Sequence, residues 1–330
     1  MGAVNIGLLK ILRNKHGDIR KKHGMEFVIT AVADSSGIAV NENGFLYGDL
    51  IDLKSAKRKV SSLSGFLAGI SSESIAGHMN VGLLIESSSG NLKTGNPGLQ
   101  VAKAALAKGC SVVFANKAPL VLAFDELHQL ANQHGGKVAY SATVCGGLPV
   151  INVLQRDLKT ASLKSFKGIL NATTNYILNE LENGGTMDMA IREAQRLGAA
   201  EADPSYDVNG YDTANKLFII MKSFANYAGT IQDISVTGIQ SVGPGQCKDA
   251  HARGNKIKLV AVAEPDENGW KLSVKPGEVK ANSFLGSCNG WEMGIELTTD
   301  LYESISMKNY EADPLGTSAA VLRDAIDVCA

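Results

Sequence analysis

The sequence predicts an α/β protein with two domains, and two observations carry this prediction. Short apolar runs bounded by turn residues, which indicate buried strands, alternate with helix-like segments over the first 140 residues or so. Strands that alternate with helices favour a parallel sheet with helices on both faces, a doubly wound arrangement. The pattern changes after a glycine-rich break, and 330 residues are enough for a second domain.

Composition and charge exclude several classes of protein. The formal net charge is −1, without a run of basic residues, so nucleic acid is not expected as a partner. No apolar run has the length of a transmembrane helix, and no signal peptide is visible. The five cysteines are scattered and include no CxxC pair, which argues against a disulfide framework and a zinc site. We therefore expect a cytoplasmic protein with no membrane partner.

The first domain is expected to span residues 1–141. Small residues lead into a helix whose apolar face includes Leu8, Leu9 and Leu12. The later elements are expected as strands at 27–33, 81–85, 110–115 and 137–141, and as helices at 98–108 and 125–133.

The first residues can form part of a dinucleotide-binding βαβ unit. In such a unit a G-x-G-x-x-G turn leads onto a helix N-terminus that holds pyrophosphate. Gly2 can serve as the second glycine, with Ala3 and Val4 beside it, whereas Asn5 occupies the third glycine position and the first would precede Met1. The first strand of the unit is therefore missing, and the sheet should lose a central member.

Other positions extend this predicted cofactor site. Asp34 ends a predicted strand and favours NAD over NADP, because an acidic side chain there accepts ribose hydroxyls. Lys57 and Arg58 follow closely enough that a contact with a 2′-phosphate stays open. Ligands bind beyond the carboxyl ends of parallel strands, where Asn116 and Lys117 follow the run CSVVFA. A lysine that simply begins a surface loop is the alternative interpretation of Lys117.

The second domain is expected to span residues 142–315, with the C-terminal helix at 316–330 packing back on the first domain. The break TVCGGLP at 143–149 marks the crossover. Beyond it the sequence predicts strands at 165–170, 236–242, 256–263 and 270–275, and helices at 187–197, from 210 to Gly229, and at 317–328. The Asn/Thr cluster at 171–176 predicts the N-cap of a further helix, and Thr186 is expected to cap the helix at 187–197.

The stretch at 200–216, AEADPSYDVNGYDTANK, carries the most chemistry. Turn residues predict a loop over its first half and a helix over its second half. Asp212 and Lys216 are four residues apart and lie on one face of that helix. A loop that brings Glu201 and Asp207 to the helix start can bind an ammonium group or tune the pKa of the lysine. An exposed ion pair beside a solvated acidic loop is the alternative.

Four stretches together resemble homoserine dehydrogenase. They are VVFANKAPL (112–120), ATVCGGLPVI (142–151), KGILNATTNYIL (167–178) and GAAEADPSYDVNGYDTANK (198–216). The last is the most specific, because it resembles the family signature E-x-D-P…D-(V/L)-x-G-x-D-x-x-x-K at the right spacing. The resemblance covers residues 1–230 well and the remainder loosely. No regulatory domain is appended, so the chain looks like the short form with a truncated N-terminus.

The resemblance implies a Rossmann-type NAD(P)-binding domain and an α+β substrate-binding and dimerisation domain in a homodimer. It implies the reversible NAD- or NADP-dependent interconversion of L-homoserine and L-aspartate 4-semialdehyde, a step in threonine, methionine and isoleucine biosynthesis. By motif position, Lys216 would be the acid–base residue at the substrate oxygen, and Lys117 would stabilise charge on that oxygen. The substrate-binding residues implied in the same way are Glu201, Asp207, Asp212 and Thr173.

The sequence departs from the family at several positions. The family's TVxGG turn binds a monovalent cation such as sodium through backbone carbonyls, here those of Val144, Gly146 and Leu148. Ser141 replaces a nearby family glutamate, which weakens the prediction of a cation site. Ala172 stands where many members have glycine.

Three alternatives stay open. The chain can be a catalytically weakened or inactive relative that binds nucleotide or amino acid, or an enzyme that acts on another amino-acid alcohol. The third alternative is an acylating semialdehyde dehydrogenase with Cys145 as the nucleophile. That chemistry needs a basic partner for the thiol, and no histidine lies in the adjoining motif.

Overall fold

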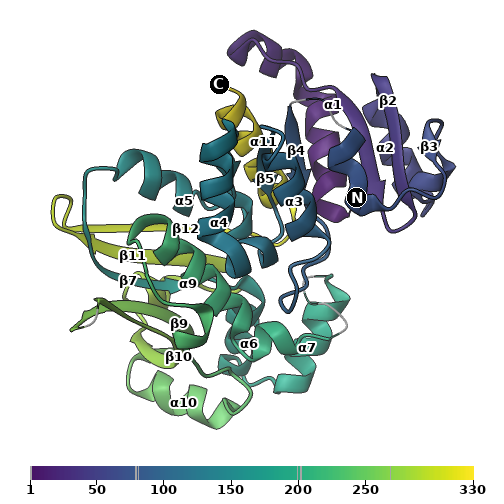
Figure 1. The fold of residues 1–330 in the computed structure, drawn as a ribbon. Helices are drawn as coiled ribbons and strands as arrows, with labels where there is room; N and C mark the ends of the chain where they lie inside the picture. Colours follow the sequence, from purple (N-terminus) through teal and green to yellow (C-terminus); the bar gives the residue numbers. More distant parts are fainter. Residues whose placement is uncertain (1, 79, 81, 199, 201–202, 268) are drawn as a thin grey trace. The chain divides into compact units, whose positions relative to one another are not determined.

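The chain forms two compact units, each described by itself (Figure 1). The computed structural model describes the whole chain except residues 1, 79, 81, 199, 201–202 and 268. Unit 1 comprises residues 1–147 and 314–330, and unit 2 comprises residues 148–313. The division falls after Gly147, where the sequence suggested a boundary after residue 141.

Unit 1 contains two three-stranded sheets. The parallel sheet has the order β4 (Leu83–Glu86), β5 (Ser111–Phe114), β6 (Val138–Ala139). The antiparallel sheet has the order β1 (Ile29–Asp34), β2 (Gly37–Phe45), β3 (Phe66–Leu67). The predicted α/β class with a parallel sheet is confirmed. The sequence prediction missed the hairpin formed by β1 and β2.

The helices of unit 1 surround these sheets. The α-helices are α1 (Ala3–His23), α2 (Tyr47–Ser55), α3 (Gly98–Leu106), α4 (Ala118–His134) and α11 (Leu315–Cys329). The 3-10 helices are η1 (Val60–Ser62), η2 (Ser72–His78) and η3 (Ser141–Thr143). The first and last helices of the chain, α1 and α11, pack against each other within this unit.

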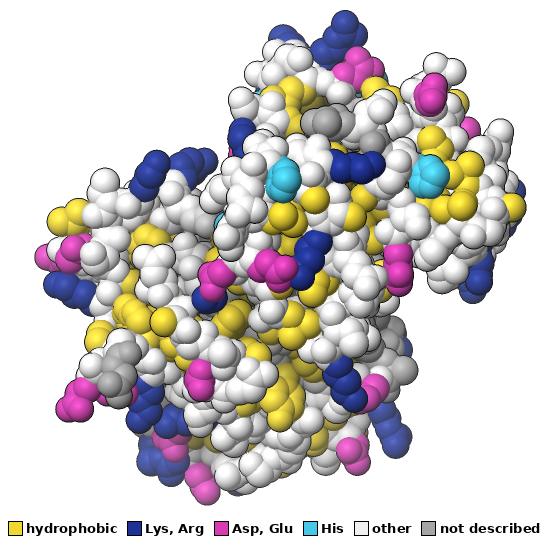
Figure 2. All heavy atoms as spheres, in the orientation of Figure 1, with side chains coloured by type: hydrophobic (Ala, Val, Ile, Leu, Met, Phe, Trp, Pro, Cys, Tyr) yellow, Lys and Arg dark blue, Asp and Glu magenta, His cyan; other side chains and the backbone are white. Residues whose placement is uncertain are grey.

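Surface charge is mixed. On the face shown in Figure 2, acidic and basic side chains lie interspersed, in keeping with the net charge of −1. Among the described residues, no helix is both long and apolar enough to cross a membrane.

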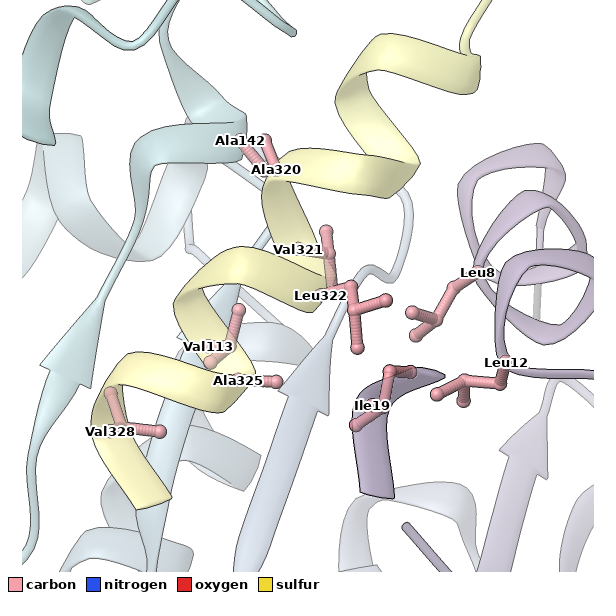
Figure 3. Packing of buried hydrophobic residues seen from close by; sticks show 10 residues of the cluster. All are labelled: Leu8, Leu12, Ile19, Val113, Ala142, Ala320, Val321, Leu322, Ala325 and Val328. Carbon is pink, nitrogen blue, oxygen red and sulfur yellow. The ribbon is translucent and has the colours of Figure 1, made fainter. Parts of the chain in front are cut away.

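The contact between α1 and α11 is close because of a glycine. Leu8 and Leu12 of α1 face Leu322 of α11 in a buried apolar cluster (Figure 3). A Cβ on Gly7 would lie 2.2 Å from Oγ of Ser318, which in turn donates a hydrogen bond to the backbone oxygen of Val4 at 2.9 Å. Only glycine therefore permits this approach, and burial of each leucine contributes roughly 1.5–3 kcal/mol.

Unit 2 is built on a mixed six-stranded sheet with the order β12-β11-β7-β9-β10-β8. Its strands are β7 (Leu163–Ile169), β8 (Ser235–Val236), β9 (Asn255–Asp266), β10 (Gly269–Lys280), β11 (Glu292–Thr299) and β12 (Ser304–Tyr310). Neighbouring strands are antiparallel except β8 and β10, which are parallel. The strands predicted at 256–263 and 270–275 are confirmed and are longer than expected. The sequence prediction missed β11 and β12.

The strand predicted at 236–242 is wrong. Only its first residue belongs to a strand, because the chain leaves the sheet after Thr237, whose N–H donates to the backbone oxygen of Val274. The next contact is with another segment, since the N–H of Ile239 donates to the oxygen of Val208 at 2.8 Å. Gly238 makes this possible, because a Cβ there would lie 2.3 Å from the Val208 oxygen.

The helical segments of unit 2 follow the predicted caps at two places. Asn171 accepts a hydrogen bond from the N–H of Thr174 at 2.8 Å, and Thr186 accepts one from Met189 at 3.3 Å. The segments are α5 (Val150–Asn152), η4 (Val153–Asp157), α6 (Ala172–Glu182), α7 (Met187–Arg196), α8 (Ser205–Val208), α9 (Tyr211–Phe224), η5 (Ile231–Asp233), α10 (Pro244–Ala252) and η6 (Leu285–Ser287).

The helix expected from 210 to Gly229 ends earlier, at Phe224. Asn226 takes a left-handed φ of 49°, and the N–H of Tyr227 returns to the oxygen of Met221 at 3.2 Å. A left-handed residue with a returning N–H is a common helix end, and asparagine tolerates it better than most residues.

Candidate active site

Lys216 and Asp212 form a buried ion pair on the first two turns of α9. Nζ of Lys216 lies 2.7 Å from Oδ2 of Asp212, and the two side chains are only 12 % and 8 % exposed. Lys216 also donates a hydrogen bond to the backbone oxygen of Leu170 at 2.7 Å. The predicted spacing on one helix face is confirmed, whereas the alternative of an exposed ion pair is wrong.

Asn171 connects this pair to the acidic segment. Its Nδ2 donates to Oδ1 of Asp207 and to Oδ2 of Asp212, both at 2.8 Å. The same side chain caps α6 through its Oδ1, so one buried amide holds two carboxylates at the turn from β7 to α6. The sequence indicated only the cap, because the two carboxylates are distant in sequence and no local pattern relates them to Asn171.

Other expected substrate residues lie around this turn or outside the described residues. Thr173 is buried on the first turn of α6, directly after Ala172. Glu201 falls outside the described residues.

Tyr206 was not singled out in the sequence. Its buried hydroxyl has no hydrogen-bond partner among the described residues, and burial followed by the charges of Asp212 and Asp207 raises its pKa.

Unit 1 contains a cavity of about 820 Å³, which is within the size range of small-molecule and cofactor pockets. Both β1 and β4 line it, although they belong to different sheets. The N-terminus of α1 also reaches the cavity, through Gly2 and Asn5.

The expected cofactor residues are distributed over this unit. Gly2 is the N-cap of α1, so Ala3 and Val4 begin that helix. Asn116 is buried, and its Nδ2 donates to Oγ of Ser88, which lines the cavity. Lys117 is the N-cap of α4, directly after the turn that follows β5.

Asp34 lies at the end of β1 and lines the cavity, but both oxygens of its carboxylate already accept hydrogen bonds from the protein. Oδ1 accepts from the N–H and the Oγ of Ser36, and Oδ2 accepts from Nζ of Lys54 and the N–H of Val60. Burial raises the pKa of Asp34, but the hydrogen bonds from Lys54, Ser36 and Val60 outweigh burial and hold the pKa well below its usual range.

Glu86 is a second carboxylate in the cavity, at the end of β4. It is buried, and its Oε1 accepts from the N–H of Ser88 at 2.9 Å and from the Ser88 hydroxyl. Burial raises the pKa of Glu86, and the Ser88 hydrogen bonds partly offset that rise. The sequence prediction missed Glu86, although an acidic residue that ends the apolar run VGLLIE was a usable signal.

The residues expected to bind a cation belong to both units. Val144 and Gly146 lie in unit 1, and Leu148 is the first residue of unit 2, where its oxygen accepts from the N–H of Val150. Ser141 binds another side chain of unit 1, because its N–H and Oγ donate hydrogen bonds to the buried carboxylate of Asp324 at 2.7 and 2.5 Å. The described residues contain no cluster of three acidic, histidine or cysteine side chains able to hold a metal.

A helix N-terminus at a cavity beside parallel strands in unit 1, and a buried lysine among carboxylates in unit 2, are each features that a nicotinamide-dependent dehydrogenase requires. Residues 149–326 match the family model described as homoserine dehydrogenase. The homoserine dehydrogenase of Methanocaldococcus jannaschii is 34 % identical over 99 % of this chain and 96 % of that protein. The chain belongs to the homoserine dehydrogenase family.

Two solved structures and a further sequence relative agree with this assignment. One from Archaeoglobus fulgidus has 32 % identity and a TM-score of 0.88, with 99 % of this chain and 97 % of that chain covered. A hyperthermophilic archaeal homoserine dehydrogenase in complex with NADPH has 26 % identity and a TM-score of 0.83, with 99 % and 95 % covered. An NAD(+)-dependent homoserine dehydrogenase of Pseudomonas canavaninivorans is 28 % identical over 99 % of this chain and 94 % of that protein.

Proposed function

We propose that Lys216 is the acid–base residue with which this homoserine dehydrogenase interconverts L-homoserine and L-aspartate 4-semialdehyde. The observation that carries the proposal is the buried pair of Lys216 and Asp212, held in place by the oxygen of Leu170. Oxidation of an alcohol removes a hydride and also the hydroxyl proton, and a positioned lysine can take that proton. In the reverse direction the protonated lysine donates to the aldehyde oxygen. Lys117 is the second lysine of the proposal and stabilises charge on the same oxygen.

The carboxylates around Lys216 provide the substrate site of the proposal. Asp207 and Asp212, both fixed by Asn171, hold the substrate ammonium together with Glu201. Thr173, on the first turn of α6, lies against the substrate or the nicotinamide. An ammonium group in this position adds an ion-pair partner to these carboxylates, and a substrate without that group forgoes this interaction.

The cavity of unit 1 is the proposed cofactor site, and its residues fit a dinucleotide. Asn5, at the start of α1, carries a buried Oδ1 with no hydrogen-bond partner among the described residues. The first N–H groups of α1, at Ala3 and Val4 after Gly2, can hold pyrophosphate, because a helix N-terminus favours negative charge. Asn116 belongs to the proposed site through its contact with the cavity-lining Ser88, and Asp34 lines the cavity with both carboxylate oxygens already hydrogen-bonded. The nicotinamide, when bound, supplies the hydride acceptor or donor.

Three further statements belong to the proposal. The chain forms a homodimer, supported by the exposed Tyr310 at the end of the edge strand β12 and by the exposed Leu301 and Tyr302 in the turn before that strand. It works in the cytoplasm, supported by five cysteines that form no disulfide bond. A monovalent cation bound by the carbonyls of Val144, Gly146 and Leu148 is its optional ligand. Light scattering, cell fractionation and turnover in sodium against choline salts test these statements in turn.

Substrate comparison tests the proposed function. We expect reduction of NAD⁺ or NADP⁺ with L-homoserine and a kcat/KM at least 100-fold lower with 4-hydroxybutyrate, which keeps the alcohol but lacks the ammonium group. Equal rates with both substrates would contradict the role of the carboxylates. Binding of homoserine without turnover would favour the catalytically inactive alternative.

A further inference from the structure

Glu86 is a buried carboxylate that the proposed mechanism does not use. It ends β4, where it is paired with Phe114 of β5, and only 4 % of the residue is exposed. Its Oε2 has no hydrogen-bond partner among the described residues. A buried charge with an unpaired oxygen costs stability, and a titratable group of this kind at a cavity is typical of a functional site. The contacts of its other oxygen show which part of the site Glu86 acts on.

Oε1 of Glu86 fixes the orientation of two side chains that follow. An ionised carboxylate only accepts hydrogen bonds, so both the N–H and the hydroxyl of Ser88 donate to it. The oxygen of that hydroxyl is then left to accept, and it accepts from Nδ2 of Asn116 at 3.4 Å. Because the amide nitrogen of Asn116 points to Ser88, its Oδ1 points to the start of α4 and accepts from the N–H of Ala118 at 3.0 Å. A series of hydrogen bonds therefore runs from Glu86 to Ala118.

Two glycines enclose this series. A Cβ on Gly98 would lie 2.8 Å both from Oε2 of Glu86 and from Nδ2 of Asn116. A Cβ on Gly90 would lie 3.1 Å from Oδ1 of Asn116. The buried amide of Asn116 is thus confined at both of its ends, and the series is closely packed as well as hydrogen-bonded.

Lys117 lies within the last hydrogen bond of the series. It stands between Asn116 and Ala118 as the N-cap of α4, so the hydrogen bond between its two neighbours fixes the backbone from which its side chain extends. Such placement matters in an active site, because a shift of a reacting group by about 1 Å can cost about 10²-fold in rate.

We propose that Glu86 is a positioning residue for Lys117, which it holds through Ser88 and Asn116 at the turn from β5 to α4. The inference rests on the proposed role of Lys117 and deepens it, because a lysine that stabilises charge on the substrate oxygen needs a fixed starting point. Glu86 acts on the reaction only through this lysine.

A double-mutant cycle in kcat, at saturating dinucleotide and homoserine, tests the proposal. Glu86→Met keeps the length of the side chain but removes its acceptors, and we expect kcat to fall at least tenfold. In the Lys117→Ala background the same substitution should change kcat by no more than twofold, since its effect passes through the lysine. Glu86→Gln retains an acceptor oxygen for Ser88 and should keep kcat within threefold of the wild type.

Hydrogen exchange followed by NMR gives a readout that does not depend on turnover. The N–H of Ala118 should exchange at least tenfold faster in Glu86→Met, because Asn116 is no longer held in the orientation that accepts from it. Ser88→Ala interrupts the series at its next member and should have the same effect, so it carries the test if Glu86→Met does not fold. Glu42→Met, at an exposed glutamate of β2, is the matched control and should change neither kcat nor this exchange rate.

The outcomes separate this inference from the proposed function. A wild-type kcat in Glu86→Met, losses that multiply in the double variant, or an unchanged exchange rate of the Ala118 N–H would overturn the inference and leave the proposed function intact. A wild-type kcat in Lys117→Ala would overturn the proposed role of that lysine and this inference with it.

Discussion

Lys258 predicts a distinctive dependence of stability on pH. This lysine of β9 is only 1 % exposed, and its Nζ donates to Oδ1 of Asn175 at 2.9 Å and to the backbone oxygen of Cys288 at 2.6 Å. Burial, with a smaller contribution from Lys256, lowers the pKa of Lys258 from 10.5 to about 8, against the opposing charge of Glu182. The native state therefore carries an energetic cost for the charged form.

The sign and size of the effect follow from linkage. Below about pH 8 the lysine is charged in both states, so the native state bears the whole cost. Between pH 8 and 10.5 the unfolded state binds more protons than the native state, and stability rises with pH. A shift from 10.5 to about 8, at about 1.4 kcal/mol for each pKa unit, corresponds to about 3 kcal/mol.

Urea unfolding at several pH values measures this effect. Both tryptophans of the chain, Trp270 and Trp291, lie in unit 2, so their fluorescence reports on the unit that contains Lys258. We expect the unfolding free energy of the wild type, minus that of Lys258→Met, to rise by about 2–3 kcal/mol from pH 7.5 to 10.5. Lys271→Met, an exposed lysine of β10, is the control and should show no such rise. A difference that stays constant with pH for Lys258→Met would refute the reasoning.

Two further predictions concern packing and the active site. Gly7→Ala should lower the unfolding free energy, because the added Cβ would clash with Ser318. Gly17→Ala on the same helix has open space around the added Cβ and should be neutral or stabilising by about 0.5–1 kcal/mol. Thermal melts of the two variants check this prediction, and equal destabilisation would contradict it. Asn171→Ser keeps an oxygen for the helix cap but loses the two amide hydrogen bonds to Asp207 and Asp212. We therefore expect a tenfold or larger loss of kcat/KM with a nearly unchanged melting temperature. Full activity of this variant would rule out the bridging role of Asn171.

Local patterns predicted much of the fold and part of the site. Helix periodicity was sufficient for the Asp212–Lys216 pair, because both residues lie on one helix and their separation fixes their distance. The caps at Asn171 and Thr186 were also readable, since a cap involves residues three positions apart. In each case the determining interaction is contained in a few consecutive residues.

The errors arose where distant segments decide the outcome. The strand expected at 236–242 is replaced by a contact between Ile239 and Val208, two residues that no local pattern relates. The role of Asp34 was predicted from its position alone, whereas its hydrogen bonds to Lys54 and Val60 depend on the path of a later segment. Asn171 likewise acquires its bridging contacts from residues 36 and 41 positions away.

The rate of homoserine oxidation by Lys216→Ala is the most direct test of the central claim. We expect kcat to fall by about 10²- to 10⁴-fold, because the variant loses the group that takes the hydroxyl proton. Lys159→Ala, an exposed lysine of the same unit, should retain the wild-type rate. Circular dichroism and calorimetric binding of homoserine would verify that both variants fold and bind substrate. A folded Lys216→Ala variant with a kcat within threefold of the wild type would contradict the assignment of Lys216 as the acid–base residue.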